Sequence, residues 1–197
     1  MKKKEVLDQL VARGGGTIRV SDIDAAGVSK TYFYDYVRRY ELRKAGHGIY
    51  QTADAWDDPF VLLQSRCSQA IFSHDTALFF HDLTDREPLH LSVTVKTGYN
   101  PHRLKSSGII VYSIKKELHD LGVINAKTPY GNVVKVYDRE RTICDMIRSR
   151  GKLETDTVLT AIKQYTGQKE KDINKLLKYA KALHVENIVR NYLEVLL

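Results

Sequence analysis

The chain has 197 residues, of which 43% are hydrophobic and 28% charged, proportions typical of a globular protein with an apolar core. No apolar run approaches the roughly 18 residues of a membrane span, and none follows the basic N-terminus, so we expect a cytoplasmic protein without a signal peptide. The formal net charge is +7, and residues 1–50 contribute +4 of it, from ten basic minus six acidic side chains. This concentration of positive charge near the N-terminus indicates an anionic partner.

The N-terminal pattern begins with a helix and a short strand. Apolar residues at helical spacing predict a helix over 4–13, which the glycines 14–16 end. A β-prone segment, 17–20, follows. Ser21, with Asp24 three residues later, then predicts a short helix that begins with a capping box.

A second helix and a hairpin complete this part of the chain. Gly27 breaks the short helix, and Ser29 is expected to cap a helix over 29–41. The segment 42–52 carries Gly46-His47-Gly48 between two β-prone pieces, which predicts a hairpin. Helix, strand, two helices and a glycine-tipped hairpin are the order of a winged helix-turn-helix, whose second paired helix enters the major groove of DNA.

Helix 29–41 is expected to bury one side and to present the other to DNA. At 100° per residue, the inward side carries Phe33, Tyr36, Val37 and Tyr40. The residues predicted to read base edges are Lys30, Thr31, Tyr34 and Arg38. The residues predicted to contact phosphates are Arg19, Arg39, Arg43, Lys44 and His47. Arginine can bind guanine with two hydrogen bonds, whereas phosphate contacts position the protein without reading sequence.

The acidic segment 53–58, followed by Pro59, predicts a boundary between two domains, 1–52 and 58–197. The second domain is expected to contain helices over 59–70, 74–82, 139–150, 155–166, 169–183 and 185–196, with strands over 89–96, 109–114, 121–127 and 132–137. The expected fold is therefore α/β of the α+β kind. An N-terminal winged helix-turn-helix precedes a small mixed β-sheet with helices and a C-terminal helical bundle.

Two charge clusters, 85–87 and 138–141, leave an enzyme as one alternative. Paired carboxylates can hold Mg²⁺ for a nuclease or a nucleotidyltransferase. Neither cluster accompanies a phosphate-binding loop, so helix caps and surface salt bridges are the preferred interpretation, with Arg141 in a buried ion pair. We therefore predict no catalytic residue, no metal and no cofactor.

Two histidines and the two cysteines are interpreted as structural residues rather than as metal ligands or catalytic groups. His74 and His81 share a helix face, but no third metal ligand is indicated, and Ser73 as a helix cap explains the segment better. Cys67 and Cys144 lie in apolar helical patterns, which favours buried thiols over a disulfide or a catalytic thiol.

The C-terminal helices carry lysines at helical spacing: Lys171, Lys175 and Lys178. One interpretation is a solvated helix face. The other is an electrostatic surface for RNA or DNA.

Three segments resemble AbiEi-family antitoxins. The sequence GGTIRVSDIDAAGVSKTYFYDYVRRYELRKAGHGIY, residues 15–50, is similar to the N-terminal winged helix of that family. The sequences IFSHDTALFFHDLTDREP, residues 71–88, and VYDRERTICDMIR, residues 136–148, are similar to its C-terminal part. The resemblance covers most of the chain in the right order.

This resemblance implies a specific function. Such proteins are antitoxins of type IV toxin-antitoxin systems that limit phage spread by abortive infection. The N-terminal domain binds inverted repeats in its own promoter and represses the operon. The C-terminal domain counteracts a nucleotidyltransferase-like toxin without a stable complex, and Lys171, Lys175 and Lys178 are then a candidate antitoxin surface that binds the substrate of the toxin. The alternative is a winged-helix transcriptional regulator whose C-terminal domain binds a ligand or a partner.

Overall fold

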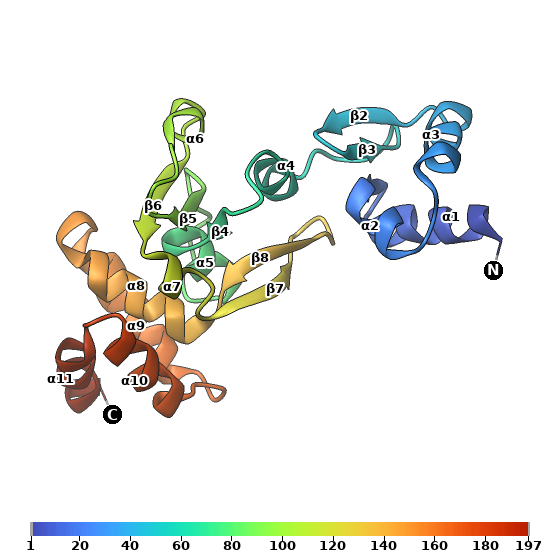
Figure 1. Cartoon of the computed structure of the whole chain (residues 1–197). Helices are drawn as coiled ribbons and strands as arrows, with labels where there is room; N and C mark the ends of the chain where they lie inside the picture. The colour runs from blue at the N-terminus through green and yellow to red at the C-terminus, as the bar shows by residue number, and fades with distance from the viewer. Residues whose placement is uncertain (1, 197) are drawn as a thin grey trace. The chain divides into compact units, whose positions relative to one another are not determined.

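The computed structural model describes residues 2–196, which divide into two compact units (Figure 1). The first unit runs to Ser68 and includes the hairpin tip, Ala126–Val134. The second comprises Gln69–Asn125 and the chain from Lys135 onward. These units are defined by contacts, so the expected domain ranges, 1–52 and 58–197, stay predictions about which parts fold independently.

The first unit contains the winged helix-turn-helix expected from the sequence. Its helices are α1 (Lys3–Arg13), α2 (Val20–Ala25), α3 (Lys30–Arg39) and α4 (Pro59–Arg66). Its strands are β1 (Thr17–Arg19), β2 (Arg43–Gly46) and β3 (Ile49–Gln51), paired antiparallel in the order β1-β3-β2. Apolar side chains from the helices and β1 form one core, made by Leu7, Ile18, Ile23, Val28, Phe33, Tyr36 and Leu42.

Two helix starts differ from the prediction. α2 begins at Val20, whose N–H donates to Gly48 O at 2.8 Å, so Ser21 is not its N-cap. Ser29 does precede α3, but its side chain makes no cap hydrogen bond. At α2, backbone pairing next to the wing therefore replaces the side-chain cap that the sequence suggested.

The buried carboxylate of Asp58 joins α4 to the hairpin tip within the first unit. One oxygen accepts the N–H groups of Phe60 and Val61 at 3.0 and 3.2 Å. The other accepts Thr128 Oγ1 at 2.7 Å and Asn132 Nδ2 at 3.0 Å. Asp58 is 1% exposed, so these four donors replace the water that the carboxylate loses.

Replacing this carboxylate should destabilise the protein. Asp58→Asn exchanges one acceptor oxygen for an NH₂ group that faces existing donors, so we expect the free energy of unfolding to fall by about 1–3 kcal/mol. Urea denaturation followed by circular dichroism measures the change. Asp85→Asn, which removes one exposed carboxylate, is the control. Equal stability of the two variants would contradict this role of Asp58.

The second unit is built on a mixed sheet with strand order β6-β5-β4-β8-β7. The strands are β4 (Ile71–Phe72), β5 (Ser92–Lys96), β6 (Ile110–Ile114), β7 (Val123–Lys127) and β8 (Val133–Tyr137), the hairpin β7–β8 carrying the tip assigned to the first unit. β4 runs parallel to β8 and antiparallel to β5, and β5 runs parallel to β6. This arrangement confirms the expected small mixed sheet.

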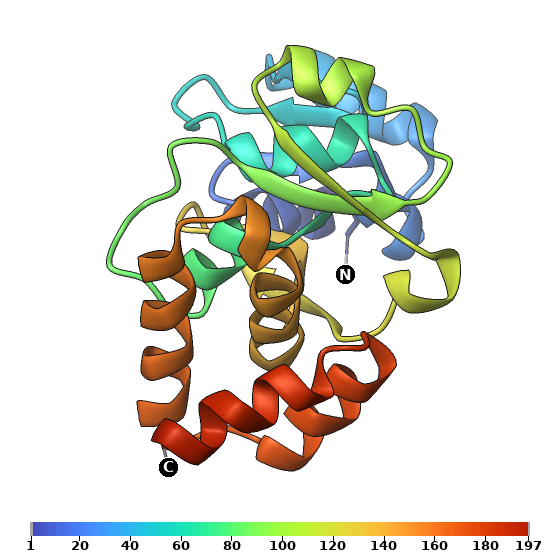
Figure 2. The ribbon, with the colours of Figure 1, turned by 90° about the vertical axis from the view of Figure 1, so that its left-hand side faces the viewer.

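Helices supply the main core of the second unit. They are α5 (His74–Phe80), α6 (His102–Ser106), α7 (Lys116–His119), α8 (Arg139–Ser149), the 3₁₀ helix η1 (Arg150–Lys152), α9 (Thr155–Gly167), α10 (Ile173–Ala182) and α11 (Glu186–Leu196). Figure 2 shows α8 to α11 gathered into the expected C-terminal bundle. Within residues 2–196, none of the helices has the length and apolar content that crossing a bilayer requires.

Several boundaries of the second unit differ from the prediction. The strand expected over 89–96 begins only at Ser92, and Leu89 is 97% exposed. The helix expected over 169–183 begins at Ile173, after its N-cap Asp172. The sequence also gave no sign of β4, α6 or α7, because elements of two to five residues form through tertiary contacts rather than through their own periodicity.

His74 lies buried at the start of α5, with a backbone φ of 50°. Its ring stacks on Tyr112 with 3.4 Å between centroids. Its two nitrogens lie 3.0 Å from Ser73 Oγ and 2.9 Å from Ser149 Oγ. Ser73 precedes α5 without making a cap hydrogen bond, so its expected role as a side-chain cap is wrong. Burial, assisted by the nearby positive charges of Arg141 and Arg148, lowers the pKa of His74 to about 3.

This pKa makes the stability of the protein depend on pH. Between pH 6.5 and about 3 the unfolded chain protonates at His74 and the folded chain does not, so the free energy of unfolding falls as the pH is lowered. The expected loss is up to about 1.4 kcal/mol per pH unit. Urea denaturation at pH 7, 6, 5 and 4 measures it against His74→Gln, which cannot protonate. A constant difference between the two proteins would show that His74 does not contribute this dependence.

Candidate nucleic-acid interface

The exposed face of α3 is the main feature of the candidate interface. Phe33 and Tyr36 are 0% and 7% exposed, which fixes the rotation of the helix about its axis. The predicted base-reading residues all face solvent as a result, namely Lys30, Thr31, Tyr34 and Arg38. The expected orientation of α3 is therefore confirmed for these four positions, while their contact with bases stays a prediction.

Tyr40 departs from the expected inward face. It lies just beyond the last residue of α3, is 42% exposed, and packs on Tyr36 with 4.5 Å between ring centroids. Lys4 Nζ lies 5.4 Å from the centroid of the Tyr40 ring. Tyr40 thus covers the edge of the core, because α3 ends before completing the turn that would bury it.

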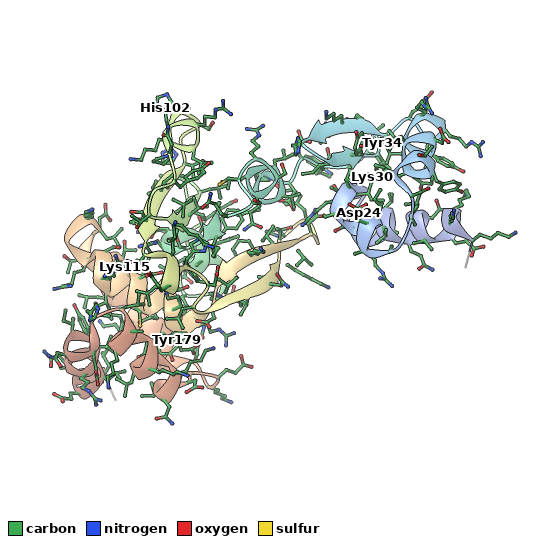
Figure 3. The ribbon with its side chains drawn as sticks, viewed as in Figure 1. Asp24, Lys30, Tyr34, His102, Lys115 and Tyr179 are labelled. Carbon is green, nitrogen blue, oxygen red and sulfur yellow. The ribbon has the colours of Figure 1, made fainter. Side chains whose placement is uncertain are left out.

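Two cations of the exposed face are held by neighbouring carboxylates. Lys30 Nζ lies 3.4 Å from Asp24 Oδ2 (Figure 3), and Arg38 forms an ion pair with Asp35 one turn earlier. All four side chains are more than half exposed. Exposed ion pairs contribute little to stability, so both cations can exchange a carboxylate for a phosphate or a base edge at small cost.

Tyr34 connects α3 to the wing, the hairpin formed by β2 and β3. Its ring lies 6.1 Å from Tyr50 and 5.5 Å from Phe33, measured between centroids. Partial burial, with the neighbouring Tyr34, raises the pKa of Tyr50. The Tyr50 hydroxyl therefore stays neutral, and the aromatic contacts restrict the rotamers of Tyr34 while its ring remains 42% exposed.

The predicted phosphate-contacting residues fall into two groups. Arg39, Lys44 and His47 are exposed on α3 and the wing. The guanidinium groups of Arg19 and Arg43 already make internal contacts. Arg19 donates to Val133 O, and Arg43 lies 2.8 Å from Asp57 Oδ1. The structure therefore does not present all five as free cations, because two of them connect loops of the first unit.

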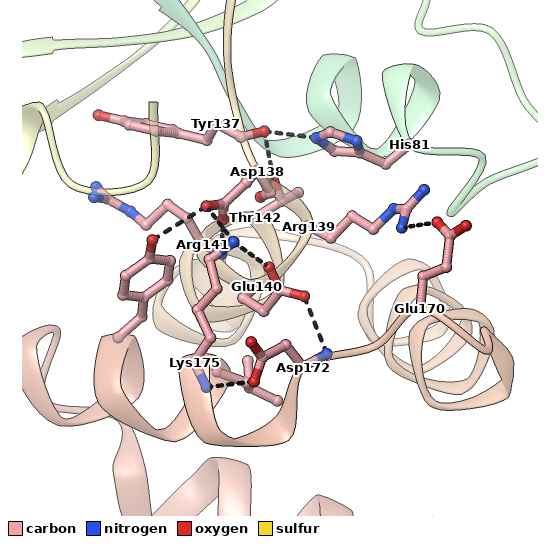
Figure 4. A network of polar contacts seen from close by, with 12 residues as sticks. His81, Tyr137, Asp138, Arg139, Glu140, Arg141, Thr142, Glu170, Asp172 and Lys175 are labelled. Carbon is pink, nitrogen blue, oxygen red and sulfur yellow. Dashed lines mark hydrogen bonds and ion pairs between the residues drawn. The ribbon is translucent and has the colours of Figure 1, made fainter. Parts of the chain in front are cut away.

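Lys175 is the clearest departure from the expected basic stripe (Figure 4). Its ammonium lies 3.1 Å from Asp138 Oδ2 and 3.0 Å from Glu140 Oε2. Burial alone would lower the pKa of Lys175, but hydrogen bonds to these two carboxylates outweigh burial and raise it. Lys175 is thus a structural cation rather than part of a free surface.

The other two lysines of that stripe do not share a free helix face with it. Lys171 precedes α10, and its Nζ donates to Gln168 O at 3.2 Å. Lys178 is exposed on α10. Because the helix begins at Ile173, Lys171 lies outside it, and the three lysines do not form the single helix face that the spacing predicted.

In the charge cluster 138–141, Arg139 forms the expected salt bridge near the surface, 2.8 Å from the exposed Glu170, whereas Asp138, Glu140 and Arg141 are buried. Asp138 does cap α8, accepting the N–H of Arg141 at 2.8 Å, as expected. Arg141 is 0% exposed, and its Nε lies 3.0 Å from Asp145 Oδ2, which confirms the predicted buried ion pair. Its Nη1 donates to Leu118 O and Leu121 O, each at 2.8 Å. The cluster therefore stabilises the second unit.

The remaining histidine and cysteine candidates are also internal. His81 is buried, and its Nε2 lies 2.6 Å from Tyr137 O. Cys67 and Cys144 are buried free thiols, as expected.

Comparison with known proteins agrees with this geometry. Residues 5–53 match a family described as transcriptional regulator, AbiEi antitoxin. Among solved structures, the chain is similar to the RV2827C protein from Mycobacterium tuberculosis, with a TM-score of 0.52 and 11% identity over 90% of this chain and 70% of that chain. At this identity the likeness shows the fold alone. No curated protein matches the sequence.

The matched residues span the winged helix from α1 to β3, including the exposed face of α3. Over this segment, about a quarter of the chain, the sequence is similar to the AbiEi antitoxin family of transcriptional regulators.

Proposed function

We propose that this protein binds duplex DNA as the repressor of its own operon and serves as the antitoxin to a nucleotidyltransferase-like toxin. The observation that carries the DNA-binding role is the exposed face of α3, with Lys30, Thr31, Tyr34 and Arg38 opposite a buried apolar face. An α-helix of this kind fits the major groove, where hydrogen-bond donors distinguish the base pairs. The family match supports a regulator that acts on DNA.

Each exposed side chain has a proposed part in DNA binding. Arg38 binds a guanine edge after releasing Asp35, and Tyr34, restrained by Tyr50, presents its hydroxyl next to it. Lys30 and Thr31 lie in the first turn of α3, where side chains of a recognition helix meet base edges.

Phosphate contacts come from the remaining exposed cations. We assign them to Arg39, Lys44 and His47, which lie on α3 and the wing. Arg19 and Arg43 are assigned to holding the loops around the wing, because Val133 O and Asp57 occupy their guanidinium groups. Phosphate contacts fix the register of the protein on DNA and make its affinity depend on salt.

The proposed operator consists of inverted repeats in the protein's own promoter, with one winged helix on each half-site. The second unit then counteracts the toxin without a stable complex, as in type IV systems that limit phage spread by abortive infection. The alternative is a regulator whose second unit binds a ligand or a partner. Protection of cells against the toxin separates these two functions.

Substitutions on α3 and on the wing should affect DNA binding differently. Arg38→Ala should cost about 1–3 kcal/mol of binding free energy and relax sequence preference, because a base contact is lost. Lys44→Ala should weaken binding to all sequences alike and lower the salt slope by about 1, because only a phosphate contact is lost. Gel shifts with the upstream promoter and with scrambled DNA, over a series of salt concentrations, measure both effects.

The control for this experiment is Arg86→Ala, which removes an exposed guanidinium from the second unit. It should leave promoter affinity within experimental error of the wild type. If Arg38→Ala and Arg86→Ala behave alike, α3 does not read the operator through Arg38. Equal affinity of the wild type for promoter and scrambled DNA would remove the repressor function.

Repression and antitoxin activity should also separate. Arg38→Ala should derepress a promoter fusion and still protect cells that express the toxin from a separate plasmid, because α3 serves only DNA binding. Colony counts and reporter activity from the same cells measure both properties. Loss of protection at an unchanged protein level would show that the two activities share α3.

A further inference from the structure

The second unit contains a long segment without acidic residues. Residues 88–116 carry no Asp or Glu, although the chain has 24 acids in 197 residues and such a window would on average hold three or four. The basic residues of this segment are Lys96, Arg103, Lys105, Lys115 and Lys116, together with His90 and His102. The positive charge of this segment is therefore not balanced along the chain.

Topology brings three of these lysines to one edge of the sheet. β5 and β6 are parallel neighbours, and Lys96, the last residue of β5, pairs with Ile114, the last residue of β6. Lys115 and Lys116 follow directly. The lysines therefore lie at the carboxyl ends of two adjacent parallel strands. Open α/β sheets bind their ligands at such ends.

A hollow of about 340 Å³ opens at this edge. Its lining residues are Gln69, Lys96, Thr97, Gly98, Tyr99, Asn100 and Lys116, none of them acidic. Lys96 is 3.7 Å from the exposed Asp120, a long and weak pair, and Lys116 takes no ion pair within residues 2–196. Gly98 has a φ of 95° with open space where a side chain would lie, so a ligand can approach its backbone closely.

We propose that this hollow binds a phosphate group, held by Lys96 and Lys116, from a nucleotide or a nucleic-acid strand. The two ammonium groups supply the charge, and the amides of Gln69 and Asn100 supply neutral hydrogen-bonding groups. Tyr99 offers an aromatic ring of the kind on which bases stack. Further positive charge flanks the residues of the hollow along the chain: Arg103 and Lys105 lie on α6, between β5 and β6, and Lys115 (labelled in Figure 3) precedes Lys116.

The experiment uses the full chain and reads the site directly. Pyrophosphate, AMP and a single-stranded RNA hexamer are titrated into ¹⁵N-labelled protein at low salt, and the amide shifts of Thr97, Gly98 and Lys116 are followed. The readout lies in the second unit, so its result does not depend on operator binding by α3. The variants are Lys96→Gln with Lys116→Gln, and the matched control is Lys178→Gln, an exposed lysine of the same unit.

We expect saturable shifts at these amides, an affinity at least about tenfold lower in the double variant, and no change in Lys178→Gln. Tighter binding of the hexamer than of AMP identifies a nucleic-acid strand as the source of the phosphate, and equal binding identifies a free nucleotide. Absence of shifts with all three probes, or equal weakening in the control, overturns the proposal.

Discussion

A charged group that leaves water must find partners, and each unit of this protein is organised around one such group. In the first unit, the carboxylate of Asp58 collects four donors from α4 and the hairpin tip. In the second, the guanidinium of Arg141 binds Asp145 and two backbone carbonyls and lies over the ring of Tyr137. Burying either charged group would be costly without these hydrogen bonds. The partners come together only because the fold joins segments that are distant in sequence.

The same principle, applied at the surface, supports the proposed contact of α3 with DNA. Its cations, Lys30 and Arg38, pair with carboxylates that remain more than half exposed. Water screens such pairs, so a DNA phosphate or guanine edge can replace the carboxylate at little cost. Lys175 shows the opposite case, because two carboxylates that are nearly buried hold it. Exposure of the partner therefore separates a cation available to a ligand from one committed to the fold.

In the second unit, the lysines that lie together in the structure are not the ones that are regularly spaced along the sequence. The spacing of the lysines at 171, 175 and 178 predicted one surface. In the structure, however, Lys171 precedes the helix and Lys175 forms an ion pair with Asp138. Lys96 and Lys116, twenty residues apart, instead line one hollow, because a parallel crossover through α6 brings the ends of β5 and β6 together. The spacing of residues along the chain can reveal which of them share a helix face. It cannot reveal which residues meet at the ends of neighbouring parallel strands.

The sequence by itself determined the elements that have a clear period and clear local breakers. It predicted α1, α3, the wing, the cap of α8 by Asp138 and the outward face of α3, because periodicity and glycines act within a few residues. Only the tertiary structure decided that Val20 begins α2, that Arg19 and Arg43 hold loops, and that Lys175 pairs with two buried acids. Each of these depends on a partner supplied by a separate element, and the burial that selects the partner exists only once the chain has folded.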